Sequence, residues 1–143
     1  MRRLLLAALL LPLAGCPPGQ TPDPKGNPAI DPGWWRGTWV VDEARLLERA
    51  RADGLSPDAL AVASSLVHEL APAYAYEIGP DALRRQTRAG ERILPARIRG
   101  IGPDAVEVDA GELRLRLSRG PGGPLLVDGG REVPVRRAAP AVD

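Results

Sequence analysis

The segments Ala105-Val-Glu-Val-Asp109 and Leu113-Arg-Leu-Arg-Leu117 decide the fold of this chain. Apolar and polar residues alternate strictly in both, so each segment presents one apolar and one polar face when it is extended. A helix would scatter the same residues around its circumference. The alternation therefore predicts two neighbouring β-strands, with Val106, Val108 and the three leucines on the buried side.

The same period of two recurs along most of the chain. Turn sequences separate the alternating segments, for example Gly79-Pro80-Asp81 and Gly102-Pro103-Asp104. Pro95 indicates a bulge or an edge within its segment. The further predicted strands are 34–41, 74–78, 82–88, 92–101, 125–127 and 133–137. About eight strands at meander spacing predict an antiparallel meander that forms a small closed barrel or a strongly curled sheet, because closure removes exposed edges.

Two segments near 43–53 and 57–70 follow the helical period instead. Asp42 suits a helix N-cap, and Gly54 suits the residue after a helix end. Ser56 before Pro57 is typical of a second N-terminus. The helical stripe of the second segment consists of Leu60, Ala63, Val67 and Leu70. The expected fold class is therefore mainly β with a helical hairpin inserted after the first strand (α+β).

The amino terminus has the organisation of an export signal. Arg2 and Arg3 precede an apolar run from Leu4 to Leu11, which is shorter than the roughly 20 residues of a membrane-spanning helix. Leu13-Ala14-Gly15-Cys16 then resembles the lipobox of bacterial lipoproteins, position by position. This resemblance implies that Cys16 carries a diacylglycerol and an N-acyl chain such as palmitate. The alternative is an ordinary signal peptide followed by a cysteine by chance.

The resemblance also implies a domain organisation and a location. Residues 1–15 form the lipoprotein signal peptide, 16–33 the lipidated Cys and a Pro/Gly-rich linker, 34–138 the barrel-like domain and 139–143 a tail. The lipid would bind the protein to a membrane of the cell envelope. Pro17 follows Cys16 where an Asp would indicate retention at the inner membrane. In an organism with two membranes, the lipoprotein pattern then implies the outer membrane, facing the periplasm.

Gly37-Thr38-Trp39 resembles the Gly-x-Trp start of lipocalin-like barrels. In that family the tryptophan plugs the closed end and a basic residue of the last strand lies across it, a role that matches Arg137. Tyr74 and Tyr76 share a face with Ile78, where they either pack in the core or line a pocket. We therefore take Trp39, Tyr74, Tyr76 and Arg137 as candidate ligand-binding residues. A solid barrel or an open α+β sheet is the alternative architecture.

Composition and motifs argue against several functions. A net charge of +1 gives no basic excess for nucleic acid. His68 is the only histidine and has no second ligand at metal-site spacing, and Ser64 and Ser65 lack a nucleophile motif. We expect no enzyme activity, no cofactor and no metal. The expected function is a non-enzymatic envelope lipoprotein that binds a protein partner or a small apolar ligand; the alternative is a carrier or chaperone that holds a hydrophobic ligand or lipid inside the barrel.

Overall fold

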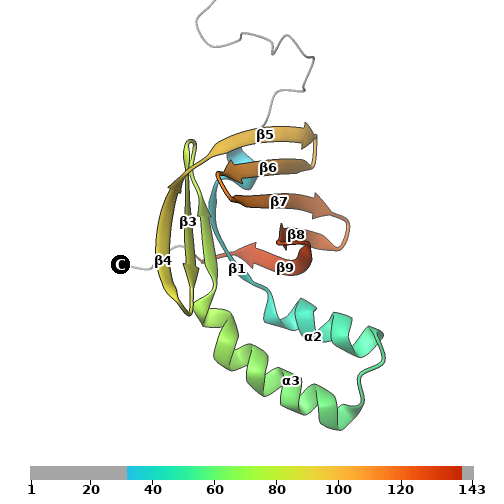
Figure 1. Cartoon of the computed structure of the whole chain (residues 1–143). Helices are drawn as coiled ribbons and strands as arrows, with labels where there is room; N and C mark the ends of the chain where they lie inside the picture. The colour runs from blue at the N-terminus through green and yellow to red at the C-terminus, as the bar shows by residue number, and fades with distance from the viewer. Residues whose placement is uncertain (1–31, 140–143) are drawn as a thin grey trace, which may run out of the picture.

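A computed structural model describes residues 32–139 of the chain. The predicted signal peptide 1–15, Cys16, the linker as far as residue 31, and residues 140–143 lie outside the described residues. Within the described part the mainly β prediction is confirmed. Nine antiparallel strands form one nearly closed, barrel-like sheet, and short helical elements lie at its ends (Figure 1).

The strands follow one another as a meander. Their order in the sheet is β4-β3-β2-β1-β9-β8-β7-β6-β5, so β1 pairs with both β2 and β9 and joins the two halves of the barrel. The strands are β1 (Gly37–Val41), β2 (Ala75–Ile78), β3 (Ala82–Thr87), β4 (Gly90–Pro95), β5 (Arg97–Gly102), β6 (Ala105–Ala110), β7 (Leu113–Gly120), β8 (Gly123–Asp128) and β9 (Arg131–Arg137).

The two segments with the clearest alternation form the centre of the second half of the barrel. Val106 pairs with Leu117 and Val108 with Leu115, and Leu117 also pairs with Leu126 of β8. These side chains are at most 1% exposed, whereas Arg114 and Arg116 between them point to solvent. The apolar face therefore lies inside, as the alternation predicts. It continues into one core that includes Trp39, Tyr76, Ile78, Leu83 and Val135.

The predicted single strand 92–101 is wrong, and its division accounts for the ninth strand. The segment is two strands, β4 and β5, separated by Ala96. Pro95 ends β4 and has no backbone N–H to continue the ladder, and the N–H of Ala96 donates to the carbonyl oxygen of Asp81 over 2.8 Å. The chain turns at this corner from one half of the barrel into the other, so β4 and β5 are the two ends of the sheet order.

The first predicted strand, 34–41, is also partly wrong. Trp34 and Trp35 belong to a helical turn, α1 (Pro32–Trp35), and β1 begins only at Gly37. Gly37 has a φ of +132°, a conformation that suits glycine and allows the change of direction between turn and strand. The blue α1 turn lies behind β5 and β6, at the end of the barrel away from the longer helices (Figure 1).

The predicted helical hairpin is present with its predicted caps. Its helices are α2 (Glu43–Ala52) and α3 (Pro57–Leu70), and the 3₁₀ turn η1 (Ala71–Ala73) leads into β2. Asp42 Oδ1 accepts from the N–H of Arg45, and Ser56 Oγ accepts from that of Ala59. Yet no residue of α2 or α3 is buried. The hairpin therefore extends beyond the barrel (Figure 1) and leaves much of its apolar surface uncovered.

Helix α2 is the part of the hairpin that is fixed to the barrel. The Arg45 guanidinium donates to the carbonyl oxygen of Pro124 over 2.8 Å, and Asp42 N–H donates to that of Pro134 over 2.9 Å. A Cβ at Gly123 would lie 2.8 Å from this guanidinium, so the contact requires glycine there. Helix α3 instead contacts α2 and η1. This arrangement leaves a space between α3 and the strands.

Candidate binding site

A cavity of about 630 Å³ lies between the helical hairpin and the open end of the barrel. This volume is within the range of about 300–1,000 Å³ found for sites of small organic ligands. Its walls come from both helices, from η1 and from the ends of β1, β2, β3, β8 and β9. The lining residues are Val41, Leu46, Leu66, Val67, Leu70, Ala71, Tyr74, Tyr76, Arg85, Asp128, Gly129, Arg131 and Val133.

The apolar part of the lining is supplied mostly by the hairpin. Leu46 of α2 and Val67 and Leu70 of α3 line the cavity and are only partly buried. Val67 and Leu70 belong to the helical stripe predicted from the sequence. Their burial against an occupant of the cavity would contribute about 25 cal/mol for each Å² removed from water.

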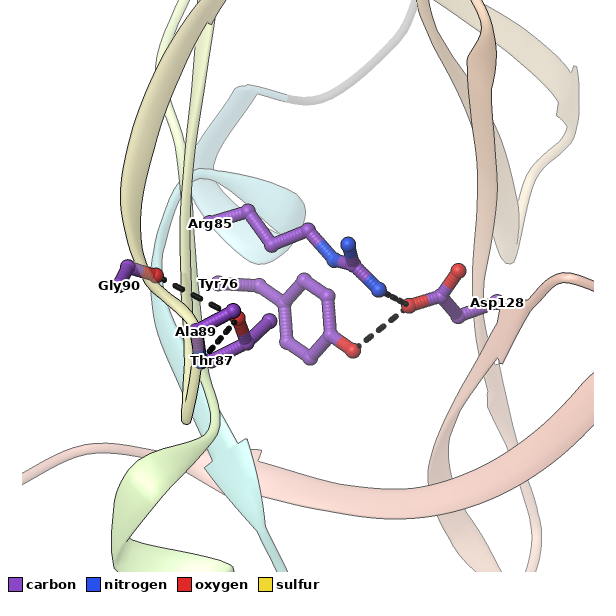
Figure 2. A network of polar contacts seen from close by, with 6 residues as sticks. All are labelled: Tyr76, Arg85, Thr87, Ala89, Gly90 and Asp128. Atoms are coloured by element: carbon purple, nitrogen blue, oxygen red, sulfur yellow. Dashed lines mark hydrogen bonds and ion pairs between the residues drawn. The ribbon is translucent and has the colours of Figure 1, made fainter.

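The polar part of the lining is a cluster of Tyr76, Arg85 and Asp128 (Figure 2). Tyr76 on β2 and Arg85 on β3 are cross-strand partners, and both side chains reach toward Asp128 at the end of β8. The Tyr76 hydroxyl donates to Asp128 Oδ2 over 2.8 Å, and Arg85 Nη2 donates to the same oxygen over 2.7 Å. One carboxylate thus connects the two halves of the barrel beneath the hairpin.

The environment of Tyr76 keeps its hydroxyl protonated. Burial, which is the largest cause, together with the hydrogen bond to Asp128 and the negative charge of that carboxylate, raises the pKa of Tyr76 to about 12, against a smaller opposing effect of Arg85. Burial disfavours a charged phenolate, and a nearby negative charge does the same. Tyr76 therefore acts as a hydrogen-bond donor, not as a base, at every physiological pH.

We expect this shift to be visible in a spectrophotometric titration. In the Tyr74→Phe protein Tyr76 is the only tyrosine, and its phenolate absorbance should rise near pH 12 and not near pH 10.0. Because the folded pKa lies above the unfolded one, the stabilisation is complete below pH 10 and is lost as the pH rises through 12. Tyr76→Phe should remove this pH dependence of the free energy of unfolding. A midpoint near 10 while circular dichroism still reports folded protein would contradict the prediction.

Trp39, in the middle of β1, and Arg137, the last residue of β9, are cross-strand partners. The Arg137 guanidinium lies 5.2 Å from the centre of the Trp39 ring, which is the contact that the lipocalin-like pattern predicts. Arg137 Nη2 also donates to the carbonyl oxygens of Gly33 and Trp34, each over 2.6 Å, and Trp39 Nε1 donates to that of Trp35 over 2.8 Å. These contacts hold α1 against β1 and β9.

The structure thus separates the four candidate residues into two groups. Tyr74 and Tyr76 line the cavity, although Tyr74 precedes β2 as the residue after η1. Trp39 and Arg137 do not line it, and a ligand-binding role for these two residues stays a prediction.

Sequence reasoning missed Arg85, Asp128 and Arg131. A signal existed for Arg85, because it is in phase with Leu83, which is fully buried, and so shares the inner face of its strand. Asp128 and Arg131 flank Gly129-Gly130 and are typical turn-flanking residues. Nothing in a single sequence shows that this hairpin turn borders a cavity.

Within residues 32–139, no group of three His, Cys, Asp or Glu side chains is placed to hold a metal ion. The His68 side chain is 85% exposed, and its Nδ1 lies 3.3 Å from Glu43 Oε2. Across the same span, no helix has the length and apolar character needed to cross a membrane.

Comparison with protein-family models, curated proteins and solved structures found no significant match.

Proposed function

We propose that this chain is a lipid-anchored protein of the cell envelope that holds a small hydrophobic ligand, or the chain of a lipid, between its helical hairpin and its barrel. The lipobox at Leu13–Cys16 supports the anchor, and in an organism with two membranes it favours the outer one, facing the periplasm. The cavity supports the binding function. No enzymatic step is part of the proposal.

One observation carries the binding function: α2 and α3 bury no residue, yet they turn leucine and valine side chains toward a 630 Å³ cavity. A hairpin that served only to cover the barrel would gain most by packing directly on the strands, because apolar burial drives such packing. The open position of α3 instead leaves an apolar wall that a ligand would complete. The polar cluster of Tyr76, Arg85 and Asp128 would orient the ligand.

A protein-binding function is the second candidate, and exposed side chains of α3 favour it. Val62 is 62% exposed and Leu66 51% exposed, although both are apolar. Leu66 also lines the cavity, so a partner that covers both side chains would lie over part of the cavity wall. The packed core from Trp39 to Leu126 would then serve only as a rigid support.

Native mass spectrometry after incubation with an envelope lipid extract distinguishes these functions. The protein would be residues 16–143 with Cys16→Ser, which contain the whole described domain without acyl chains. We expect one added lipid mass per chain. Val67→Lys, within the cavity, should remove the adduct, whereas Val62→Lys, on the same helix but outside the cavity lining, should retain it. If the Cys16→Ser protein without a further substitution binds no lipid, the carrier function is wrong.

A further inference from the structure

We propose that the cavity selects a single-chain amphiphile with an anionic head, whose acidic group lies between Arg85 and Arg131. This inference rests on the proposed binding function and adds the chemical class of the ligand. Carboxylate and phosphate heads share the required chemistry, namely several acceptor oxygens and a negative charge. Two arms of the experiment below distinguish them.

The charges of the cavity lining do not cancel. Arg85 and Arg131 are positive and Asp128 is negative, and within the described part of the chain no other Arg, Lys, Asp or Glu lines the cavity. Asp128 is occupied by Arg85, with 2.7 Å between Oδ2 and Nη2. Arg131 forms none of the ion pairs found within residues 32–139. One positive charge is therefore left for a ligand.

The hydrogen-bonding groups point to the same class of ligand. Arg85 Nε is buried and has no acceptor among residues 32–139, although Nη2 of the same side chain donates to Asp128. A buried donor without an acceptor is costly, so a ligand oxygen that reaches it is favoured. Arg131 adds a second guanidinium, a planar group whose donors match carboxylate and phosphate oxygens. A neutral alcohol would satisfy fewer of these donors, and a cationic head would be repelled by Arg131.

The two kinds of lining residue come from different elements, as binding of an amphiphile requires. Tyr76, Arg85 and Asp128 come from β2, β3 and the end of β8 (Figure 2), and Arg131 comes from the start of β9. Leu46, Val67 and Leu70 come from the hairpin. An acidic head on the strands would leave the hydrocarbon chain against α2 and α3. This placement would bury the apolar helix surface that the protein itself leaves uncovered.

Titration calorimetry with four ten-carbon probes tests the inference on residues 16–143 with Cys16→Ser, below the micelle concentration of each probe. Decanoate and decyl phosphate should bind at least about tenfold more tightly than decan-1-ol, a difference of about 1.4 kcal/mol, because hydrogen bonds to charged groups are stronger than those to neutral groups. Decylammonium should bind most weakly. Acetate and inorganic phosphate should not bind measurably, because they lack the chain.

A pair of variants assigns the selectivity to the cavity. Arg131→Gln should weaken decanoate binding about tenfold and leave decan-1-ol unchanged. Arg136→Gln, an exposed arginine on the same strand that does not line the cavity, should change neither. Equal affinity for all four probes, or preference for decylammonium, would overturn the anionic class and keep the binding function. Failure of every ten-carbon probe to bind would overturn both.

Discussion

Trp39→Ala is expected to lower the free energy of unfolding by about 4 kcal/mol, the scale measured for removal of a buried aromatic side chain. Trp39 is 2% exposed and belongs to the single core cluster. Its Nε1 donates a hydrogen bond to the carbonyl oxygen of Trp35, and its ring makes a cation–π contact with the Arg137 guanidinium. The substitution would leave a cavity, free the α1 turn and remove the surface on which Arg137 lies. Urea unfolding followed by circular dichroism measures the loss.

Trp34→Ala is the matched control for this prediction. Trp34 is only partly buried, and its ring contacts the Arg119 guanidinium, 4.9 Å from the ring centre, at the surface. We expect its replacement to cost about 1 kcal/mol, in the range of an exposed cation–π contact. Equal losses of unfolding free energy for the two variants would show that Trp39 stabilises the barrel no more than Trp34 does. A loss below about 1 kcal/mol for Trp39→Ala would contradict the prediction directly, because such values are typical of surface positions.

Cys16→Ser is expected to abolish acylation of the protein completely. The lipobox interpretation places both lipid groups on this residue, and serine offers no thiol for a thioether. Cells grown with labelled palmitate should incorporate the label into the unchanged chain and not into the variant. Mass spectrometry of the unchanged protein should find Cys16 as its first residue, with the mass of the acyl groups added.

Gly15→Ala provides the control, because the lipobox pattern accepts glycine or alanine before the cysteine. This variant should keep the label and the processed amino terminus. An unmodified thiol at Cys16 in the unchanged protein would refute the anchor and leave the cavity and its proposed ligand unaffected. Two acyl chains or more give stable membrane binding, whereas a single chain gives marginal binding.

The parts of the fold that depend on local pattern were predictable. The alternation around Leu115 and Val108 predicted the buried face, since the pleat fixes which side chains point inward. Asp42 and Ser56 predicted the helix starts, because their side-chain oxygens accept from the first free N–H groups. The pairing of Arg137 with Trp39 came from the lipocalin-like pattern and is present in the structure.

The parts that depend on distant contacts were not predictable. Trp34 and Trp35 favour strands by propensity. Arg137, more than one hundred positions away, instead stabilises a helical turn there by donating hydrogen bonds to the carbonyl oxygens of Gly33 and Trp34. The corner at Ala96 likewise depends on the carbonyl oxygen of Asp81. Pro95 indicated an irregularity there but not a transfer between the two halves of the barrel.

The candidate site illustrates the same division at the level of single side chains. Tyr76 stood on a face shared with Ile78, and the structure buries both. Asp128 became a site residue only because closure of the sheet brings the end of β8 opposite β2 and β3. A sequence pattern contains no information about closure of that kind, so the acidic member of the cluster could not be recognised in advance.

The placement of α1 and the hairpin at opposite ends of the barrel has a consequence for a tethered protein (Figure 1). The polypeptide enters the domain through α1, so the proposed lipid at Cys16 would attach the molecule from the α1 end of the barrel. The mouth beneath the hairpin would then face the aqueous compartment and not the bilayer below it. A protein in this orientation would take up or release its ligand on the side away from its own membrane, by exchange with another molecule there.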